Sequence, residues 1–174
     1  MEKNIFLVGF MGTGKSSVGR RLAKTMKMDF FDTDQEMEKI TGMDLVTLYQ
    51  KYGPIRYQSE EGLILDKCLK KSNAVIATGG TLKYTPDRLR AMKQRGMIVC
   101  LRADEEKIYE RVVRKNTRPL LRKNHVRSDL EELYEPHFCW EAGSDLVIDT
   151  TVLEFREIIR MIREKWEETD RREN

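Results

Sequence analysis

Residues 9–17 read GFMGTGKSS, and this stretch decides the fold. Gly9, Gly14, Lys15 and Ser16 meet the phosphate-loop pattern G-x-x-x-x-G-K-[ST]. A β-rich apolar run at 4–8 precedes the loop, and a helical pattern with apolar residues at every fourth position follows it. Glycines in such a loop let backbone N–H groups converge on phosphate oxygens, and the helix N-terminus adds a positive dipole end. The stretch therefore predicts a P-loop nucleotide-binding domain.

The residues of this loop have separate expected tasks. Lys15 reaches the β and γ phosphates, and the Ser16 hydroxyl ligates magnesium. The same loop and first helical turn supply the remaining expected nucleotide contacts, from Gly9, Gly12, Thr13, Gly14 and Ser17.

Short apolar runs alternate with helical patterns along the rest of the chain. Further strands are expected at 30–31, 74–77, 97–101 and 146–148, and helices at 35–40, 44–52, 54–69, 86–95, 104–115, 128–135 and 153–166. Continuous apolar runs are typical of parallel strands buried on both faces. The pattern predicts a single α/β domain over 1–174, with a three-layer, five-stranded parallel sheet and helices on both faces. The last residues, 167–174, are expected to be frayed.

Composition excludes several classes of protein. Hydrophobic residues make up 40% and charged residues 35% of the 174 residues, with a net charge of only +3. Basic and acidic residues are interleaved, so no nucleic-acid partner is expected. No apolar run approaches the roughly 20 residues of a membrane span, and no signal peptide is recognised, which favours the cytoplasm.

Other absent motifs narrow the class further. The three cysteines have no CxxC spacing, so neither a disulfide framework nor a zinc site is expected. No guanine-reading NKxD motif occurs, which argues against a GTPase. Nothing demands an oligomer, so a monomer is expected.

Two further motifs follow predicted strands, at the sheet edge where ligands bind in parallel α/β folds. Asp32 and Asp34 flank Thr33, so that one carboxylate can reach magnesium while the other accepts a proton from, or orients, an attacking hydroxyl. The alternative is that Asp34 only caps the next helix. Gly79 and Gly80 form a pair that would let a substrate approach the backbone closely.

The order of these motifs resembles the shikimate kinase family. The resemblance covers nearly the whole chain and is strongest at GFMGTGKSSVGRRLA (9–23), FFDTD (30–34), NTRPLL (116–121) and VIDT (147–150). It implies a P-loop kinase fold with a mobile lid at about 114–127 and an acceptor-binding helical region at about 34–61. It also implies that ATP and Mg²⁺ are used to phosphorylate a hydroxyl of a small cyclic acid, shikimate.

The same resemblance implies roles for individual residues. Lys15, Asp34 and Arg118 would be catalytic, with Asp34 holding the reacting hydroxyl and Arg118, in the lid, meeting the phosphoryl group. Ser16 and Asp32 would support the magnesium, and Arg111 would stack on the adenine. Gly79 and Gly80 would line the acceptor pocket.

The chain departs from the family pattern where the acceptor's carboxylate is expected to bind. Gln58 replaces the arginine of an F-R-x-x-E pattern that Tyr57 and Glu61 otherwise meet, and Tyr134 replaces that of an R-x-P-x-Y pattern. Thr81 replaces the third glycine of a GGG run. Gln58 and Tyr134 are then the expected acceptor contacts, and each offers a neutral hydrogen bond where a charged, bidentate one is expected.

Four other cations could compensate for this loss. Arg56 is the nearest in sequence, although two helical residues differ by roughly 200° in direction; Lys83, Arg88 and Arg127 are further candidates. Three interpretations remain open: a shikimate kinase with an altered pocket, a related kinase for another small polyol or sugar-like acceptor, and a nucleotide-binding regulatory protein without transfer activity.

Overall fold

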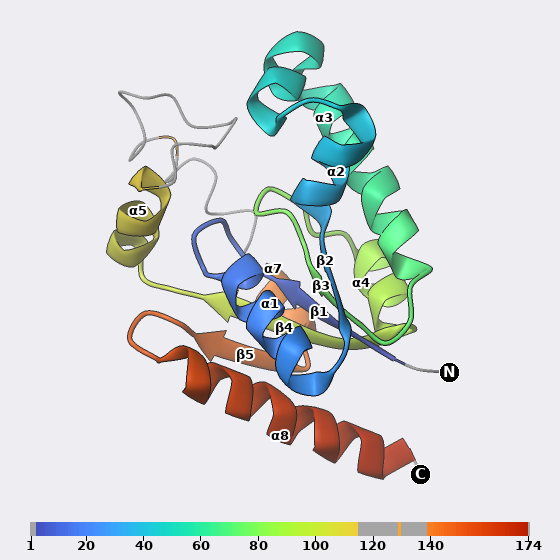
Figure 1. The fold of residues 1–174 in the computed structure, drawn as a ribbon, viewed down its shortest axis with the longest axis vertical. Helices are drawn as coiled ribbons and strands as arrows, with labels where there is room; N and C mark the ends of the chain where they lie inside the picture. Colours follow the sequence, from blue (N-terminus) through green and yellow to red (C-terminus); the bar gives the residue numbers. More distant parts are fainter. Residues whose placement is uncertain (1–2, 115–128, 130–138, 174) are drawn as a thin grey trace.

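The fold is seen in a computed structural model that describes residues 3–114, 129 and 139–173 (Figure 1). The strands are β1 (Asn4–Val8), β2 (Asp29–Asp32), β3 (Ala74–Ala77), β4 (Gly96–Arg102) and β5 (Leu146–Asp149). The helices are α1 (Lys15–Met26), α2 (Thr33–Thr41), α3 (Leu45–Leu69), α4 (Pro86–Lys93), α5 (Glu105–Val113), α7 (Cys139–Gly143) and α8 (Phe155–Glu173).

The five strands form one parallel sheet in the order β2-β3-β1-β4-β5, which confirms the predicted α/β fold class. β1 lies at the centre, where Ile5 is in register with Val75 of β3 and Met97 of β4. β2 and β3 lie on one side of β1, and β4 and β5 lie on the other. The carboxyl end of β1 is therefore the switch point at which open α/β sheets bind ligands. The GFMGTGKSS loop follows β1 at that point.

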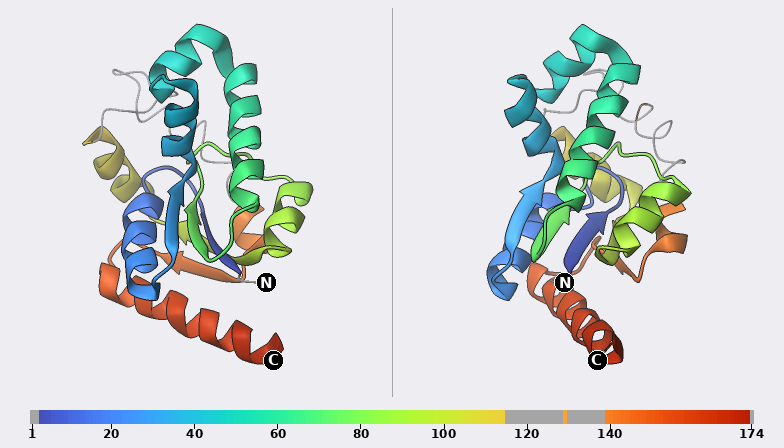
Figure 2. Two further views of the ribbon diagram at one scale, coloured as in Figure 1. Left: turned by 45° about the vertical axis from the view of Figure 1, so that its right-hand side comes forward. Right: turned by 90° about the vertical axis from the view of Figure 1, so that its right-hand side faces the viewer.

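Helices cover both faces of the sheet, as predicted (Figures 1 and 2). Alternate residues of β1 point to opposite layers: Leu7 belongs to a cluster with residues of α1 and α8, whereas Phe6 belongs to one with residues of α2, α3, α4 and α7. A small third cluster packs the loop residues Phe10 and Met11 against α5. This last contact holds α5 over the loop.

Two predicted boundaries were wrong, and one predicted break was confirmed. α2 begins at Thr33 rather than about 35. The break expected between the helices at 44–52 and 54–69 is present within α3 as a kink at Gly53, where φ is 75° and ψ is 176°. The expected fraying from residue 167 is wrong as well, because α8 continues to Glu173. In its last turns Glu167 pairs with Arg163 and Arg171, at 3.8 and 3.9 Å, and such i,i+4 pairs favour helix.

Parts of two predicted segments lie outside the described residues. Of the lid at about 114–127 the structure describes only Arg114, and of the helix at 128–135 only Asp129, which is helical and buried. Within the described ranges, each helix is too short or too polar to cross a membrane.

Candidate functional site

A pocket of about 390 Å³ opens at the carboxyl edge of the sheet. Its described lining comes from the loop and α1, the start of α2, the segment after β3, the end of α5 and the segment after β5. The lining residues are Gly12, Thr13, Gly14, Lys15, Ser16, Ser17, Val18, Asp34, Thr78, Gly80, Arg111, Arg114, Thr150, Leu153, Phe155 and Ile158. The structure thus brings most predicted nucleotide-binding residues together with Asp34 and Gly80.

Lys15 lies inside the loop that it follows. Its side chain is buried, and Nζ donates hydrogen bonds to the carbonyl oxygens of Gly9 at 2.7 Å and Phe10 at 2.8 Å. The Thr13 hydroxyl donates to the Phe10 oxygen as well, at 2.8 Å. These contacts close the loop around a fixed ammonium group at the floor of the pocket.

The N-terminus of α1 has no side-chain cap. Its N-cap residue is Gly14, in the left-handed region with φ of 100°, which has no side chain to cap the helix. The first N–H groups of a helix have no partner within the helix, so they are available to an anion. Together with Lys15, this end of α1 is suited to bind phosphate oxygens.

Gly9 is the one predicted loop residue that does not line the pocket. A Cβ atom there would lie 2.1 Å from the carbonyl oxygen of Leu101. Gly9 is therefore required by the close passage of the loop over β4, and its contribution to binding is to place the loop.

Asp32 and Asp34 take different positions at the β2–α2 junction. Asp32 is the N-cap of α2, and its Oδ1 accepts from the backbone N–H groups of Asp34 at 3.1 Å and Gln35 at 3.4 Å. The alternative that Asp34 caps this helix is therefore wrong. Asp34 lies in the first turn of α2 and lines the pocket, so its carboxylate is placed to meet a ligand.

The Gly79–Gly80 pair joins β3 to the loop and to α2. A Cβ atom on Gly80 would lie 2.7 Å from the Cα atom of Met11, and one on Gly79 would lie 2.6 Å from Oδ1 of Asp34. The N–H group of Gly79 donates to the Thr33 hydroxyl at 2.8 Å. Both glycines are thus needed where two backbones or a carboxylate approach closely, and Gly80 also lines the pocket.

Glu61 is a residue whose importance the sequence alone did not reveal. Its carboxylate is buried beside that of Asp34. A Cβ atom added to Gly79 would lie 2.6 Å from Asp34 Oδ1 and 3.1 Å from Glu61 Oε1. Thr81 donates a hydrogen bond to Glu61 at 2.7 Å. Burial raises the pKa of Glu61 to about 7, against the opposing Thr81 bond, and the charge of Asp34 raises it further.

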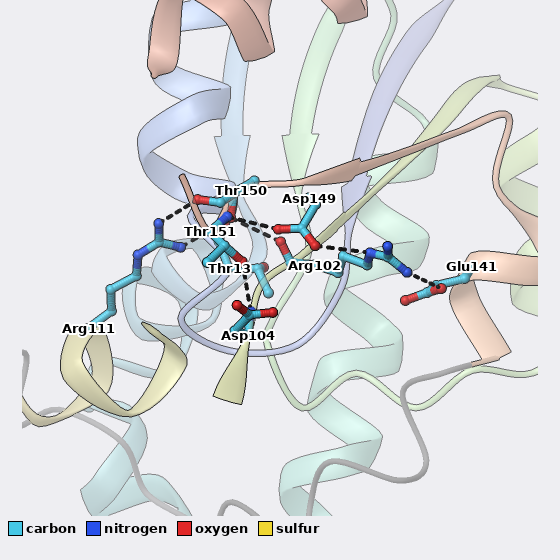
Figure 3. A network of polar contacts seen from close by, with 8 residues as sticks. All are labelled: Thr13, Arg102, Asp104, Arg111, Glu141, Asp149, Thr150 and Thr151. Atoms are coloured by element: carbon cyan, nitrogen blue, oxygen red, sulfur yellow. Dashed lines mark hydrogen bonds and ion pairs between the residues drawn. The ribbon is translucent and has the colours of Figure 1, made fainter. Parts of the chain in front are cut away.

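Arg111 connects α5 to the loop and to the end of β5 (Figure 3). Its guanidinium donates to the carbonyl oxygens of Thr150 at 2.7 Å and Gly12 at 3.2 Å, and to the Thr150 hydroxyl at 3.1 Å. Loss of hydration lowers the pKa of Arg111, as does the neighbouring charge of Arg114. The guanidinium lines the pocket, but these bonds make it a brace for the loop as well as a possible surface for the base.

Thr150 was missed in the sequence, although it ends the VIDT motif. Its side chain is buried, and its hydroxyl lies within hydrogen-bond distance of the carbonyl oxygens of Thr13 at 2.9 Å and Arg102 at 3.0 Å. A threonine directly after a predicted buried strand was the available signal. Its function is to tie the carboxyl end of β5 to the phosphate loop.

Gln58 and Arg56, the two α3 residues considered for the acceptor's carboxylate, are not part of the described pocket lining. Gln58 is exposed. Arg56 pairs with Glu60 at 2.6 Å and lines a separate groove with Leu48 and Tyr52, so it faces away from the pocket, as the helix geometry predicts. Arg118, Arg127 and Tyr134 lie outside the described residues.

Comparison with known proteins gives consistent results. The family model for shikimate kinase matches residues 11–167. A shikimate kinase of Pelotomaculum thermopropionicum is 46% identical over 75% of this chain and 76% of its own, and one of Thermodesulfovibrio yellowstonii is 37% identical over 95% of both. The solved structure of shikimate kinase from Acinetobacter baumannii in complex with shikimate has a TM-score of 0.87 at 30% identity and covers 94% of this chain and 92% of its own.

Proposed function

Because this chain belongs to the shikimate kinase family, we propose that it transfers the γ-phosphoryl group of ATP to a hydroxyl group of shikimate. Members of this family are ATP-dependent small-molecule kinases. The observation that carries the proposal is the placement of Asp34 in the same pocket as Lys15 and the uncapped N-terminus of α1. One pocket thus holds groups for both the phosphate donor and the hydroxyl acceptor.

The phosphate side of the reaction depends on the loop and α1. Lys15 and the first N–H groups of α1 are positioned to bind the phosphate oxygens and to offset the charge that develops during transfer. Arg111 and Thr150 hold the loop in this shape. Because these groups are preorganised, little rearrangement is required when the nucleotide binds.

The acceptor side depends on Asp34. In the proposed mechanism its carboxylate accepts a hydrogen bond from the reacting hydroxyl, orients the oxygen toward the γ-phosphorus and receives the proton as the new O–P bond forms. Thr33 and Gly79 fix the turn in which Asp34 lies. Gly80 lines the pocket, and the absence of a side chain at Gly79 lets the Asp34 carboxylate lie close to the backbone after β3.

Magnesium fits the residues at this site. The Ser16 hydroxyl lines the pocket, and the α2 cap within the described residues uses Oδ1 of Asp32. One hydroxyl and one carboxylate are enough, since Mg²⁺ keeps several waters and takes its other ligands from substrate phosphates. When bound, Mg²⁺ supplies charge neutralisation on the β and γ phosphates.

We further propose that the enzyme acts as a monomer in the cytoplasm, without a nucleic-acid partner. The support is its substrate class, its interleaved surface charges and its free thiols, which are typical of a reducing compartment. Burial raises the pKa of Cys68 to about 11 and that of Cys100 to about 12, so both thiols stay protonated and unreactive.

The proposal is tested by coupled ADP release with ATP, Mg²⁺ and millimolar shikimate, beside a panel of small polyols and sugar acids. Shikimate-dependent turnover at ordinary kinase rates, roughly 1–100 s⁻¹, is the expected result. One observation favours a second acceptor class: Gln58 is neutral where the family pattern has arginine. Turnover of an uncharged polyol without turnover of shikimate would establish that alternative and overturn the proposal.

A further inference from the structure

The acceptor in the proposed function is an anion, so its carboxylate needs a positive partner. Lys15 is buried in the phosphate loop, Arg56 faces another groove and Gln58 is neutral. A carboxylate that leaves water without a cation or several hydrogen bonds loses far more free energy than it gains. Among the described residues, a cation on another element of the fold is therefore the candidate partner.

Two cations from the segment after β3 lie near the acceptor side of Asp34. Arg88, in the first turn of α4, and Lys83, just before α4, both act on the buried carboxylate of Glu61 by their positive charge. Glu61 in turn lies next to Asp34 above Gly79. Arg88 and Lys83 thus act on the same buried carboxylate as Asp34, the group that would hold the reacting hydroxyl.

Arg88 is held in place by its surroundings. Its Nη1 donates a hydrogen bond to the carbonyl oxygen of Lys83 at 2.7 Å, and its Nη2 packs on Gly62, where a Cβ atom would lie 3.4 Å away. The absence of a side chain at Gly62 gives the guanidinium room beside α3. Arg88 is only partly exposed, so its orientation is more restricted than that of a free surface arginine.

Arg88 also retains binding capacity. Among the described residues no ion pair within 4.0 Å includes Arg88 or Lys83, whereas Arg90 on the same helix pairs with Asp87 at 3.6 Å. A guanidinium has five N–H donors, and among the described residues Arg88 donates one hydrogen bond, to Lys83. A planar group with free donors is suited to bidentate binding of a carboxylate.

From this geometry we infer that Arg88 binds the carboxylate of the acceptor, in place of the arginine that Gln58 replaces, and so determines that the enzyme prefers an anionic acceptor. The inference rests on the proposed function. The carbonyl oxygen of Lys83 holds Arg88, and the Lys83 side chain adds a second positive charge that acts on Glu61. Glu61 accepts the Thr81 hydrogen bond and interacts with the charges of both Arg88 and Asp34.

The test compares Arg88→Gln with the matched control Arg90→Gln, using shikimate and its uncharged methyl ester as acceptors. Arg88→Gln should lower kcat/KM for shikimate roughly 10- to 100-fold, the effect of losing a charge-assisted hydrogen bond. The same variant should leave kcat/KM for the ester and KM for ATP within about twofold of wild type. Arg90→Gln should match wild type with both acceptors.

Further variants separate binding from indirect effects. If Arg88 served only to offset the negative charge of Glu61, the double variant Arg88→Gln/Glu61→Gln would regain turnover of shikimate. This restoration would overturn the inference. Equal losses for shikimate and its ester, or no loss for either, would overturn it too. Should Arg88→Gln fail to fold, Arg88→Lys, which keeps the charge but not the planar fork, should show a smaller loss confined to shikimate.

Two outcomes separate the proposed function from the role of Arg88. Absence of wild-type turnover with shikimate would overturn the proposed function and this inference together. If the wild-type enzyme turns over shikimate and Arg88→Gln behaves like Arg90→Gln, only the role of Arg88 is overturned.

Discussion

At the scale of single residues, the chain separates two carboxylates that the sequence places only two positions apart. Asp32 points into the backbone of α2 and accepts two N–H groups, whereas Asp34 reaches the pocket above Gly79. A cap contributes to helix stability, typically about 1 kcal/mol, while a carboxylate facing a pocket contributes to chemistry. Substitution of the two residues should therefore have different consequences.

Asp34→Asn should slow phosphoryl transfer by 100-fold or more and leave KM for ATP nearly unchanged. The amide keeps the shape of the side chain but cannot accept the proton of the reacting hydroxyl, and such a group contributes roughly 10²–10⁴ in rate. Steady-state kinetics with varied ATP and varied acceptor would measure both parameters. Asp32→Asn is the comparison: an asparagine still caps α2, but it removes a proposed Mg²⁺ ligand, so its effect should depend on the Mg²⁺ concentration. Normal turnover by Asp34→Asn would remove this residue from the mechanism.

Glu61 gives stability a pH dependence of predictable sign. The pKa of Glu61 is about 7 in the folded chain, whereas the ordinary pKa of a glutamate, 4.5, applies in the unfolded chain. Between these two values the folded state keeps a proton that the unfolded chain has lost. The free energy of unfolding should therefore fall as pH rises from about 4.5 to about 7, by on the order of 3 kcal/mol from this group.

Urea unfolding of wild type and Glu61→Gln at pH 5 and pH 8 would measure this effect. The variant should lose the part of the pH 8 destabilisation that arises from Glu61, so its two free energies should lie closer together. Glu164→Gln, on the exposed surface of α8, is the control and should retain the wild-type profile. Parallel profiles for Glu61→Gln and wild type would contradict the proposed burial of the charged form.

At the scale of elements, the kink in α3 separates two different surroundings. Before Gly53 the helix packs Leu45 and Leu48 beside α2, and after it Tyr57, Ile64 and Leu65 pack over the sheet. The backbone at Gly53, with φ of 75° and ψ of 176°, is in a region that only glycine occupies readily. The bend thus directs the first half of α3 beyond the edge of the sheet (Figure 1).

Gly53→Ala should lower the free energy of unfolding by about 1–3 kcal/mol, since a side chain is strained at this φ although no atom lies within 4 Å of the added Cβ. If the bend positions the acceptor region, KM for the acceptor should rise more than KM for ATP. Denaturant unfolding and steady-state kinetics would measure both. Ser59→Ala, exposed in the same helix, should change stability by less than about 0.5 kcal/mol. A Gly53→Ala protein as stable as wild type would show that the kink carries no strain cost.

The elements that the sequence predicted well are those with a strong local signal. β1 and β3 are short runs of buried apolar residues, β4 is mostly so, and α1 and α5 have one clear apolar face. The break at Gly53 in α3 was also predicted, but the length of α8 was not, because i,i+4 ion pairs support its last turns. Such ion pairs are not visible in hydrophobic periodicity.

At the scale of the whole molecule, the parallel sheet assembles a site from residues spread over most of the chain. The phosphate loop was predictable because its residues are contiguous, and Asp34 was predictable because strand ends share one edge. Glu61, Arg88 and Thr150 were not predicted with specific contacts, since their positions depend on how α3, α4 and β5 pack. Local patterns thus identified the nucleotide side of the site better than the acceptor side.

A division into nucleotide and acceptor sides predicts two separable effects on thermal stability. ADP at about 100 times its Kd should stabilise the folded chain by about 2.7 kcal/mol, which for a domain of this size raises Tm by roughly 5–11 °C. Lys15→Met should abolish the ADP-dependent shift and phosphoryl transfer, because it removes the only ammonium inside the described phosphate loop. Differential scanning fluorimetry of each protein with and without ligand would measure the shifts.

The acceptor provides the internal control for that measurement. Shikimate should raise the Tm of Lys15→Met and wild type by similar amounts, since its proposed contacts are at Asp34 and Arg88 rather than in the loop. Arg88→Gln should show the reverse pattern, with the ADP shift kept and the shikimate shift reduced. A Lys15→Met protein that still responds to ADP as wild type does would contradict the assignment of this loop as the phosphate site. An equal loss of both shifts in either variant would contradict the division into separate nucleotide and acceptor sides.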